Sequence, residues 1–420
     1  MRHKGILLVA ILSAWLVPHG YGQKRQGVEG WDVVVLPSVS YNTDLGFHYG
    51  VYGNAFYYGQ GERCSYPHFR HKLSFEASRY TSKQSLLYLQ YDGCGLPGGI
   101  DISATGRWQT DPYYYFWGYN GLPFLSRQTN ALPYYRHHRR YLMLNGQISK
   151  AVTPRLKVFS AITLWDYDIA ASDSSDTEAT NLWASYRRQG LIEALECDGG
   201  TLLDFKIGVH YDSRNHPTTP SQGCLAEAFL TGSIDLRHAH YNSWKANGQF
   251  VFYHAFGSRV VLANRTVGQY TLAGEEPYFT LTNIHTLSRT AISSEGLGGV
   301  TTLRGMPLNA LSTNGFAWNN TEVRIRLFSL RLLKRDIDVV ANPFYDIGIP
   351  LQFYRMERQT TGEGQPVQRS DLFRPYMTIG IGGKLIVNQN FVLSVEAGML
   401  LNDPAEHRSW SVSFCTGYIF

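Results

Sequence analysis

The stretch Leu203-Asp204-Phe205-Lys206-Ile207-Gly208-Val209-His210-Tyr211-Asp212 alternates between two kinds of side chain. Its odd-numbered positions are apolar or aromatic, and its even-numbered positions are charged, polar or glycine. Successive side chains of a β-strand point to opposite faces, so this segment is predicted to be a strand with one apolar and one polar face. The same alternation recurs near the end of the chain, in the segments 377–387, 391–399 and 410–420. In the last of these, the apolar face runs from Trp410 to Phe420.

Two all-β classes fit such strands: a secreted soluble sandwich and a closed barrel in a membrane. The composition is 44% hydrophobic and 14% aromatic, with 41 glycines, and no apolar run is long enough for a membrane-spanning helix. A chain that sits in lipid without such helices satisfies its backbone only as a closed barrel. Repetition of half-polar strands, aromatic residues at strand ends and a terminal Phe420 favour a transmembrane antiparallel β-barrel over the sandwich.

The beginning of the chain predicts a cleaved export signal. Met1-Arg2-His3-Lys4 is basic, residues 5–17 form a short apolar run, and Gly20-Tyr21-Gly22 supplies small residues before Gln23. We therefore expect a signal peptide over 1–22, a short periplasmic lead over 23–30 and one outer-membrane β-barrel domain over 31–420.

The pattern contains about 16 strand-like segments, an even number as expected for a single-chain bacterial barrel. Their predicted starts lie near Trp31, Phe47, His71, Gln84, Gly99, Tyr135, Arg155, Thr201, Gly223, Trp244, Arg259, Phe316, Ile337, Phe373, Phe391 and Ser409. With both termini in the periplasm, the long segment between the eleventh and twelfth strands lies on the outer side.

That long segment carries a lone arginine among glycines, in Gly298-Gly299-Val300-Thr301-Thr302-Leu303-Arg304-Gly305-Met306-Pro307. The following strands supply two acidic residues, Glu322 and Asp346. A guanidinium makes directional, charge-assisted bonds, so Arg304 between these carboxylates would hold the loop inside a polar cavity. On spacing alone, a solvated loop arginine near unrelated acids is the favoured interpretation.

The motif resembles the BamA- and TamA-type barrels of the bacterial surface antigen superfamily, which assemble outer-membrane proteins. Leu303-Arg304-Gly305-Met306 is similar to the tip of their inward-folded loop, with Met306 in place of the usual Phe or Tyr. Glu322 and Phe344-Tyr345-Asp346-Ile347-Gly348 match acidic patterns on the next two strands. The resemblance implies a barrel with an inward-folded long loop, locked by Arg304, Glu322 and Asp346. It covers nearly all of the mature protein.

The end of the chain resembles the C-terminal assembly signal of outer-membrane barrels, which implies a role for Tyr418 and Phe420. The usual glycine five residues before the end is replaced by Cys415. Between Gln23 and the first strand there is only a short polar lead, so we expect a short member without POTRA domains, the periplasmic domains that receive substrates. The resemblance implies a protein that assists insertion or translocation of other proteins, with separate periplasmic partners. A structural or pore-forming barrel without insertase activity remains the alternative.

The expected seam of the barrel lies between the first and last strands. Pro37 sits inside the strand-like segment 33–41 and cannot donate a ladder hydrogen bond, which confines proline mainly to edges, strand starts and bulges. Opposite it, Gly417 softens the last strand. We predict incomplete pairing here, although Pro37 could instead end the lead, with the strand starting at Ser38.

The remaining patterns predict no enzyme and no bound cofactor or metal. His238 and His240 with Asp235 could form a hydrolytic cluster on an outer loop, but a solvated loop explains them better. The expected partners are outer-membrane lipids and lipopolysaccharide, whose phosphates could meet the basic cluster 135–140, and client or partner outer-membrane proteins. The net charge of +5 argues against nucleic acid. Cys64 and Cys94 fall in neighbouring periplasmic turns, where either a disulfide or free thiols would be possible.

Overall fold

The computed structural model describes residues 30–42, 45–59, 69–121, 132–171, 181–285, 296–332, 335–360, 365–387, 391–402, 410–416 and 420. In these residues sixteen antiparallel strands form one barrel, in which each strand pairs with its neighbours in sequence and the last returns to the first. The all-β barrel predicted from the alternation is confirmed. The expected signal peptide and most of the lead fall outside the described residues.

The strands are β1 (Trp31–Asn42), β2 (Gly46–Tyr57), β3 (His71–Tyr80), β4 (Ser85–Leu96), β5 (Ile100–Tyr115), β6 (Arg136–Ala151), β7 (Leu156–Ala170), β8 (Gly199–Asp212), β9 (Gly223–Asp235), β10 (Ser243–Phe256), β11 (Val260–Gly274), β12 (Gly315–Leu332), β13 (Arg335–Gln352), β14 (Tyr376–Val387), β15 (Phe391–Leu400) and β16 (Trp410–Thr416). Every start predicted from the sequence lies within three residues of an observed start. The count of sixteen is also confirmed.

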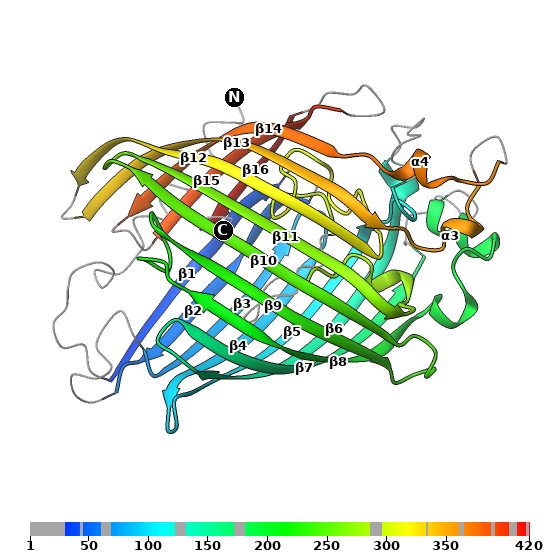
Figure 1. Cartoon of the computed structure of the whole chain (residues 1–420), viewed down its shortest axis with the longest axis horizontal. Helices are drawn as coiled ribbons and strands as arrows, with labels where there is room; N and C mark the ends of the chain where they lie inside the picture. The colour runs from blue at the N-terminus through cyan, green and yellow to red at the C-terminus, as the bar shows by residue number, and fades with distance from the viewer. Residues whose placement is uncertain are drawn as a thin grey trace.

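Short turns and long connections gather at opposite ends of the barrel. The turns between β6 and β7 and between β10 and β11 lie at one end with the start of β1. The other end carries α3 (Leu182–Arg188) and α4 (Arg369–Leu372), seen together at one side of Figure 1. It also carries the short helices η2 (Leu132–Tyr135), η3 (Ala194–Glu196), η4 (Tyr278–Thr280) and η5 (Met356–Arg358). Among the described residues, no helix is long and apolar enough to cross a membrane.

Side-chain exposure follows the alternation of the sequence. On β8, Phe205 and Ile207 are 40% and 64% exposed, whereas Asp204 and Lys206 are 4% and 5% exposed. The apolar face therefore points outward and the polar face inward, which is the reverse of a soluble protein and typical of a barrel in lipid.

Part of the interior is occupied by the long connection between β11 and β12, of which residues 275–285 and 296–314 are described. Leu297, Leu303 and Leu311 of this segment are fully buried. They belong to one apolar cluster with aromatic residues of the barrel wall and of the outer loops, including Trp117. The Trp117 indole donates a hydrogen bond to the Leu308 carbonyl at 2.8 Å. The long loop is thus folded inward, as the resemblance implied.

One expectation about the end of the chain is wrong. The alternation placed Phe420 on the outward, apolar face of the last strand, but β16 ends at Thr416. Phe420 instead packs against Leu225, Val251, Tyr253 and Ala263 on the inner wall. Its main-chain oxygen accepts a hydrogen bond from Arg324 at 2.8 Å, so a polar partner inside the barrel competes with the lipid face for this residue.

Candidate functional site

Arg304 lies at the tip of the inward-folded loop, and glycines shape that tip. Gly298 and Gly305 have φ of +120° and +97°, a region that favours glycine. A Cβ on Gly305 would lie 2.5 Å from the Gly398 carbonyl carbon. Because Gly305 has no side chain, the tip lies directly against β15.

The guanidinium of Arg304 is held by carboxylates from three strands. Its Nε and Nη2 donate to Asp346 at 2.9 and 2.7 Å, which is a two-bond fork, and the Arg304 main-chain N–H donates to the same carboxylate at 3.1 Å. Its Nη1 donates to Glu322 at 2.9 Å and lies 3.5 Å from Glu396. The guanidinium carbon is 3.6 Å from the centroid of the Phe344 ring. The structure thus brings together the three charged residues that the sequence singled out.

Alternation around Glu322 predicts Arg324 on the same inner face, but sequence reasoning did not connect Lys384 and Glu396 with this network. Lys384 pairs with Glu396, and Arg324 donates to Glu322 at 2.6 Å. Counting these, the three cations Arg304, Arg324 and Lys384 face the three carboxylates Glu322, Asp346 and Glu396, all buried. Alternation had already placed Lys384 and Glu396 on polar faces, but it could not show that β14 and β15 bring them to the loop tip. We call these six residues the loop lock.

The other two residues of the tetrapeptide motif fill apolar space beside the charges. Leu303 and Met306 are 0% and 1% exposed. A Cβ on Gly348 would lie 2.7 Å from Leu303 Cδ1, so glycine at this position of β13 makes room for the leucine. Each named position of the Phe-x-Asp-x-Gly pattern therefore has its own role: the Phe344 ring packs against the Arg304 guanidinium, Asp346 accepts its hydrogen bonds, and Gly348 makes room for Leu303.

The seam of the barrel is unsealed. β1 pairs with β2 along twelve residues, and this pairing includes Pro37 with Val51. Between β1 and β16, by contrast, the described residues form one pair, Asn42 with Ser413. Because β1 runs unbroken from Trp31 through Pro37, the alternative start at Ser38 is wrong. Gly417 and Tyr418 lie outside the described residues.

A second buried arginine holds the long-loop end of the barrel together. Arg355 lies 2.5 Å from Glu196, 2.8 Å from Glu275 and 3.4 Å from Glu193. Burial acts to raise the pKa of Glu193, but hydrogen bonds from Arg358 and Tyr241 and the charge of Arg355 outweigh it and leave that pKa below its ordinary value. Burial dominates at Glu196 and raises the pKa of that carboxyl despite Arg355. Sequence reasoning did not identify this outer cluster.

The sequence-derived hydrolytic cluster does not come together. Asp235 accepts hydrogen bonds from the main-chain N–H groups of Arg237 and His238, which makes it a turn residue. His240 faces Glu193 instead, at 4.0 Å. Across the described ranges, no group of three or more His, Cys, Asp or Glu side chains is placed to hold a metal ion.

Two further sequence interpretations can be placed. In the basic cluster, His137 and Arg139 are 1% and 2% exposed, and the Arg139 guanidinium lies 3.6 Å from the Tyr114 ring centroid. These two side chains therefore point into the barrel and do not form a lipopolysaccharide-facing surface. Cys64 lies outside the described residues, so its pairing with Cys94 stays a prediction.

No known family model and no curated protein matches the sequence. Solved structures do match its fold. BamA from Haemophilus ducreyi lacking POTRA domains 1–3 has a TM-score of 0.58 and 13% identity, covering 93% of this chain and 70% of that one. CdiB from Escherichia coli has a TM-score of 0.58 and 12% identity, covering 93% and 63%. CdiB from Acinetobacter baumannii has a TM-score of 0.51 and 11% identity, covering 92% and 59%. This chain therefore has the sixteen-stranded barrel fold of BamA and CdiB, with an unsealed seam between its first and last strands.

Proposed function

We propose that this chain is a bacterial outer-membrane barrel of the BamA-like surface antigen superfamily, which assists insertion or translocation of other proteins. The unsealed seam carries the proposal. β1 is a full-length strand that forms one residue pair with the described residues of β16, and the edge of β1 along those residues is otherwise left to pair with another strand. An unpaired strand edge templates added strands through main-chain hydrogen bonds.

The loop lock supports the same function from inside the barrel. It ties the long loop to β12, β13 and β15, and β15 is the neighbour of the seam strand β16. Because the loop lock fixes the barrel wall as far as β15, the barrel opens at the seam between β1 and β16. The mechanism involves strand exchange and lipid contact, without bond chemistry or a cofactor. Its partners are outer-membrane lipids with lipopolysaccharide, client barrels and separate periplasmic proteins.

Depletion in the native bacterium tests the proposal. Loss of the protein should lower the amounts of other outer-membrane barrels, measured by quantitative proteomics of isolated outer membranes. Wild-type protein should restore them. A variant carrying Val39→Cys and Thr416→Cys should restore them when reduced, and after oxidation it should restore them less, in proportion to the fraction of the protein in which the seam disulfide has formed. Unchanged barrel levels after depletion would instead support a structural or pore-forming subunit.

A photo-crosslinker locates the contact. Val35 on β1 and Phe250 on β10 are both exposed, at 50% and 47%. Val35 lies beside the seam, whereas Phe250 lies far from it. A photoreactive residue in place of Val35 should capture other barrels during their synthesis, whereas the same residue in place of Phe250 should not. Equal capture at both positions would contradict a role for the seam.

A further inference from the structure

The strand β12 continues beyond its neighbour β11 at the end of the barrel that carries the short turns. The last residue pair between the two strands joins Val260 to Ile325. Residues 327–332 still belong to β12, but no described residue pairs with them on the side of β11. At about 3.3 Å per residue, these residues form a free strand edge of roughly 20 Å. The main-chain groups along this edge are therefore open to another strand.

This free edge is part of a preformed sheet. Behind it, Phe328 pairs with Val339 and Leu330 pairs with Ile337 on β13. β13 in turn pairs with β14 as far as the pair of Ile337 with Val387. Because two further strands support β12 here, the edge is already extended before a partner arrives. A preformed edge costs an added strand less ordering than an edge that must first assemble.

The side chains of the free edge form two different faces. The face that continues the lipid-facing surface is apolar and between 40% and 53% exposed, and it consists of Phe328, Leu330 and Leu332. On the opposite face, Ser329 donates a hydrogen bond to Asp338, and Arg331 lies 3.7 Å from Asp336. Arg331 and Asp336 are 75% and 80% exposed, so this polar face lies outside the packed interior. A strand that fits the edge must alternate in the same way.

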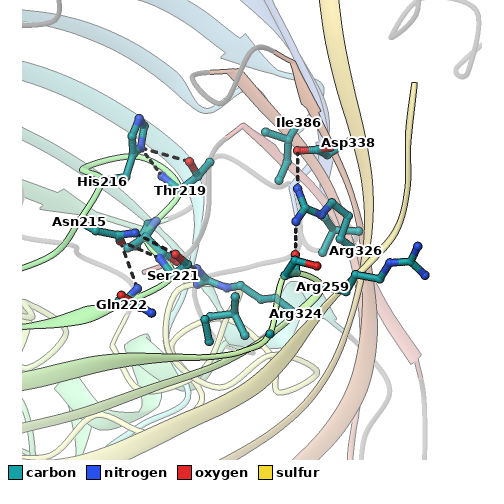
Figure 2. Close-up of a pocket in the computed structure, with 16 residues that line it drawn as sticks. Asn215, His216, Thr219, Ser221, Gln222, Arg259, Arg324, Arg326, Asp338 and Ile386 are labelled. Carbon is teal, nitrogen blue, oxygen red and sulfur yellow. Dashed lines mark hydrogen bonds and ion pairs between the residues drawn. The ribbon is translucent and has the colours of Figure 1, made fainter. Parts of the chain in front are cut away.

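Positive charge dominates the polar face next to the edge. A cavity of about 590 Å³ adjoins the root of the edge, and its described cationic lining residues are Arg259, Arg324 and Arg326. Figure 2 shows Arg326 beside Asp338 in the wall of this cavity, 3.9 Å apart. β12 itself carries Arg326 and Arg331, whereas Asp336 and Asp338 lie on β13, one strand further from the edge. Since cross-strand neighbours of opposite charge attract, an added strand is favoured when its polar side chains are acidic.

We propose that the edge formed by residues 327–332 binds a β-strand of another polypeptide in which apolar and acidic side chains alternate. The main chain of that strand makes the hydrogen bonds that β11 does not supply. Its apolar side chains lie beside Leu330, and its acidic side chains face Arg326 and Arg331. A second copy of this chain fits less well, because its own edge would bring the same two arginines to this face. The proposal stands on strand register and charge and does not depend on the seam between β1 and β16.

Photo-crosslinking in the full-length protein in mild detergent tests the edge. Benzoylphenylalanine in place of Leu330 should capture a peptide of alternating valine and glutamate several-fold better than one of alternating valine and lysine. The glutamate peptide N-methylated at every residue lacks main-chain donors and should also be captured several-fold less. Equal capture of the three peptides would overturn the proposal. So would crosslinks to detergent or to a second copy alone, or capture of the glutamate peptide from Val35 on β1 but not from Leu330.

Two charge reversals in the same crosslinking protein test how the edge selects its partner. Arg331→Glu should reverse the preference, so that the lysine peptide is captured several-fold better than the glutamate peptide. Lys150→Glu is the matched control and should keep the original preference. Lys150 is exposed at the same end of the barrel, but its strand is paired on both sides, with Ile100 on β5 and Val158 on β7. A preference for the glutamate peptide that persists in Arg331→Glu, or that disappears in Lys150→Glu, would overturn recognition of charge at this edge.

Discussion

Arg304 stabilises the barrel chiefly because none of its charged partners is left unpaired in the interior. The side chains of Arg304, Glu322 and Asp346 are at most 2% exposed. Removing one member of a buried charge pair typically costs about 3–5 kcal/mol, since the other charge remains without compensation. An exposed pair contributes roughly 0–1 kcal/mol.

Arg304→Ala should therefore lower the free energy of unfolding by about 3–5 kcal/mol and expose the segment 298–307 to protease. Melting of the detergent-solubilised barrel and limited proteolysis measure the two effects. Glu322→Ala and Asp346→Ala should act alike, and each combined with Arg304→Ala should add less than the sum. Arg331→Ala is the control, because Arg331 and its partner Asp336 are 75% and 80% exposed. Unchanged melting and cleavage in Arg304→Ala would contradict the lock.

Gly305 gives a second prediction at the residue scale. Gly305→Ala would strain a left-handed backbone and press a methyl group against β15, so it should destabilise the barrel by more than 1 kcal/mol. Gly257→Ala is the matched control, since Gly257 also has positive φ but has no atom within 4 Å of the added Cβ. Chemical unfolding compares them. Equal losses would mean that backbone strain alone, without close approach to β15, explains the glycine.

Among the strands, β1 shows how proline and an open edge go together. Proline lacks the N–H of a ladder bond, and an edge strand tolerates that lack better than a central one. β1 meets this condition because, where the structure describes both strands, its other side pairs with β16 at one residue. The assignment of this openness to Pro37 stays a prediction.

Disulfide formation across the seam tests it. Continuing the register from Asn42 and Ser413 would place Val39 opposite Thr416. Cysteines at these two positions should crosslink less completely than cysteines replacing the paired Phe250 and Thr266 on β10 and β11. Adding Pro37→Val should raise the seam yield, because a donor is restored. Complete crosslinking in both pairs would show that the seam is sealed in solution.

The outer loops depend on Arg355 as the long loop depends on Arg304. Arg355→Ala should leave Glu196 and Glu275 without their cation, while Glu193 keeps Arg358, and should loosen α3, η3 and η5. We expect new protease sites in 182–197 and 353–359, with the barrel strands still intact. Arg358→Ala is the control, since Arg358 is 44% exposed and pairs with Glu193. Identical cleavage of the two variants would argue against a central role for Arg355.

The strands, the loop lock and the end of the chain differ in how well they could be predicted from the sequence. Strand positions could be predicted from alternation, because the two-residue repeat of apolar and polar side chains is a property of each local segment, such as 203–212. The pairing of Arg304 with Glu322 and Asp346 was predicted from the resemblance, since spacing alone favoured a solvated arginine. Glu396, Lys384 and Arg355 were missed because their partners are set by which strands and loops become neighbours. Phe420 was misplaced because continued alternation cannot show where a strand stops.

At the scale of the whole molecule, the outward apolar face and the packed interior predict a heat-modifiable barrel. Its main-chain hydrogen bonds run between strands all around the barrel, apart from the seam, so detergent alone should leave the structure intact. Unboiled protein in mild detergent should migrate faster on a gel than boiled protein and give a strand-dominated circular dichroism spectrum. Arg304→Ala should shift this change in migration to a lower temperature, and Arg331→Ala should not. A helical spectrum, or recovery of the protein in the soluble periplasmic fraction, would contradict the membrane barrel itself. If Arg304→Ala changes migration at the same temperature as the wild-type protein, the barrel fold stands, but the loop lock does not stabilise it.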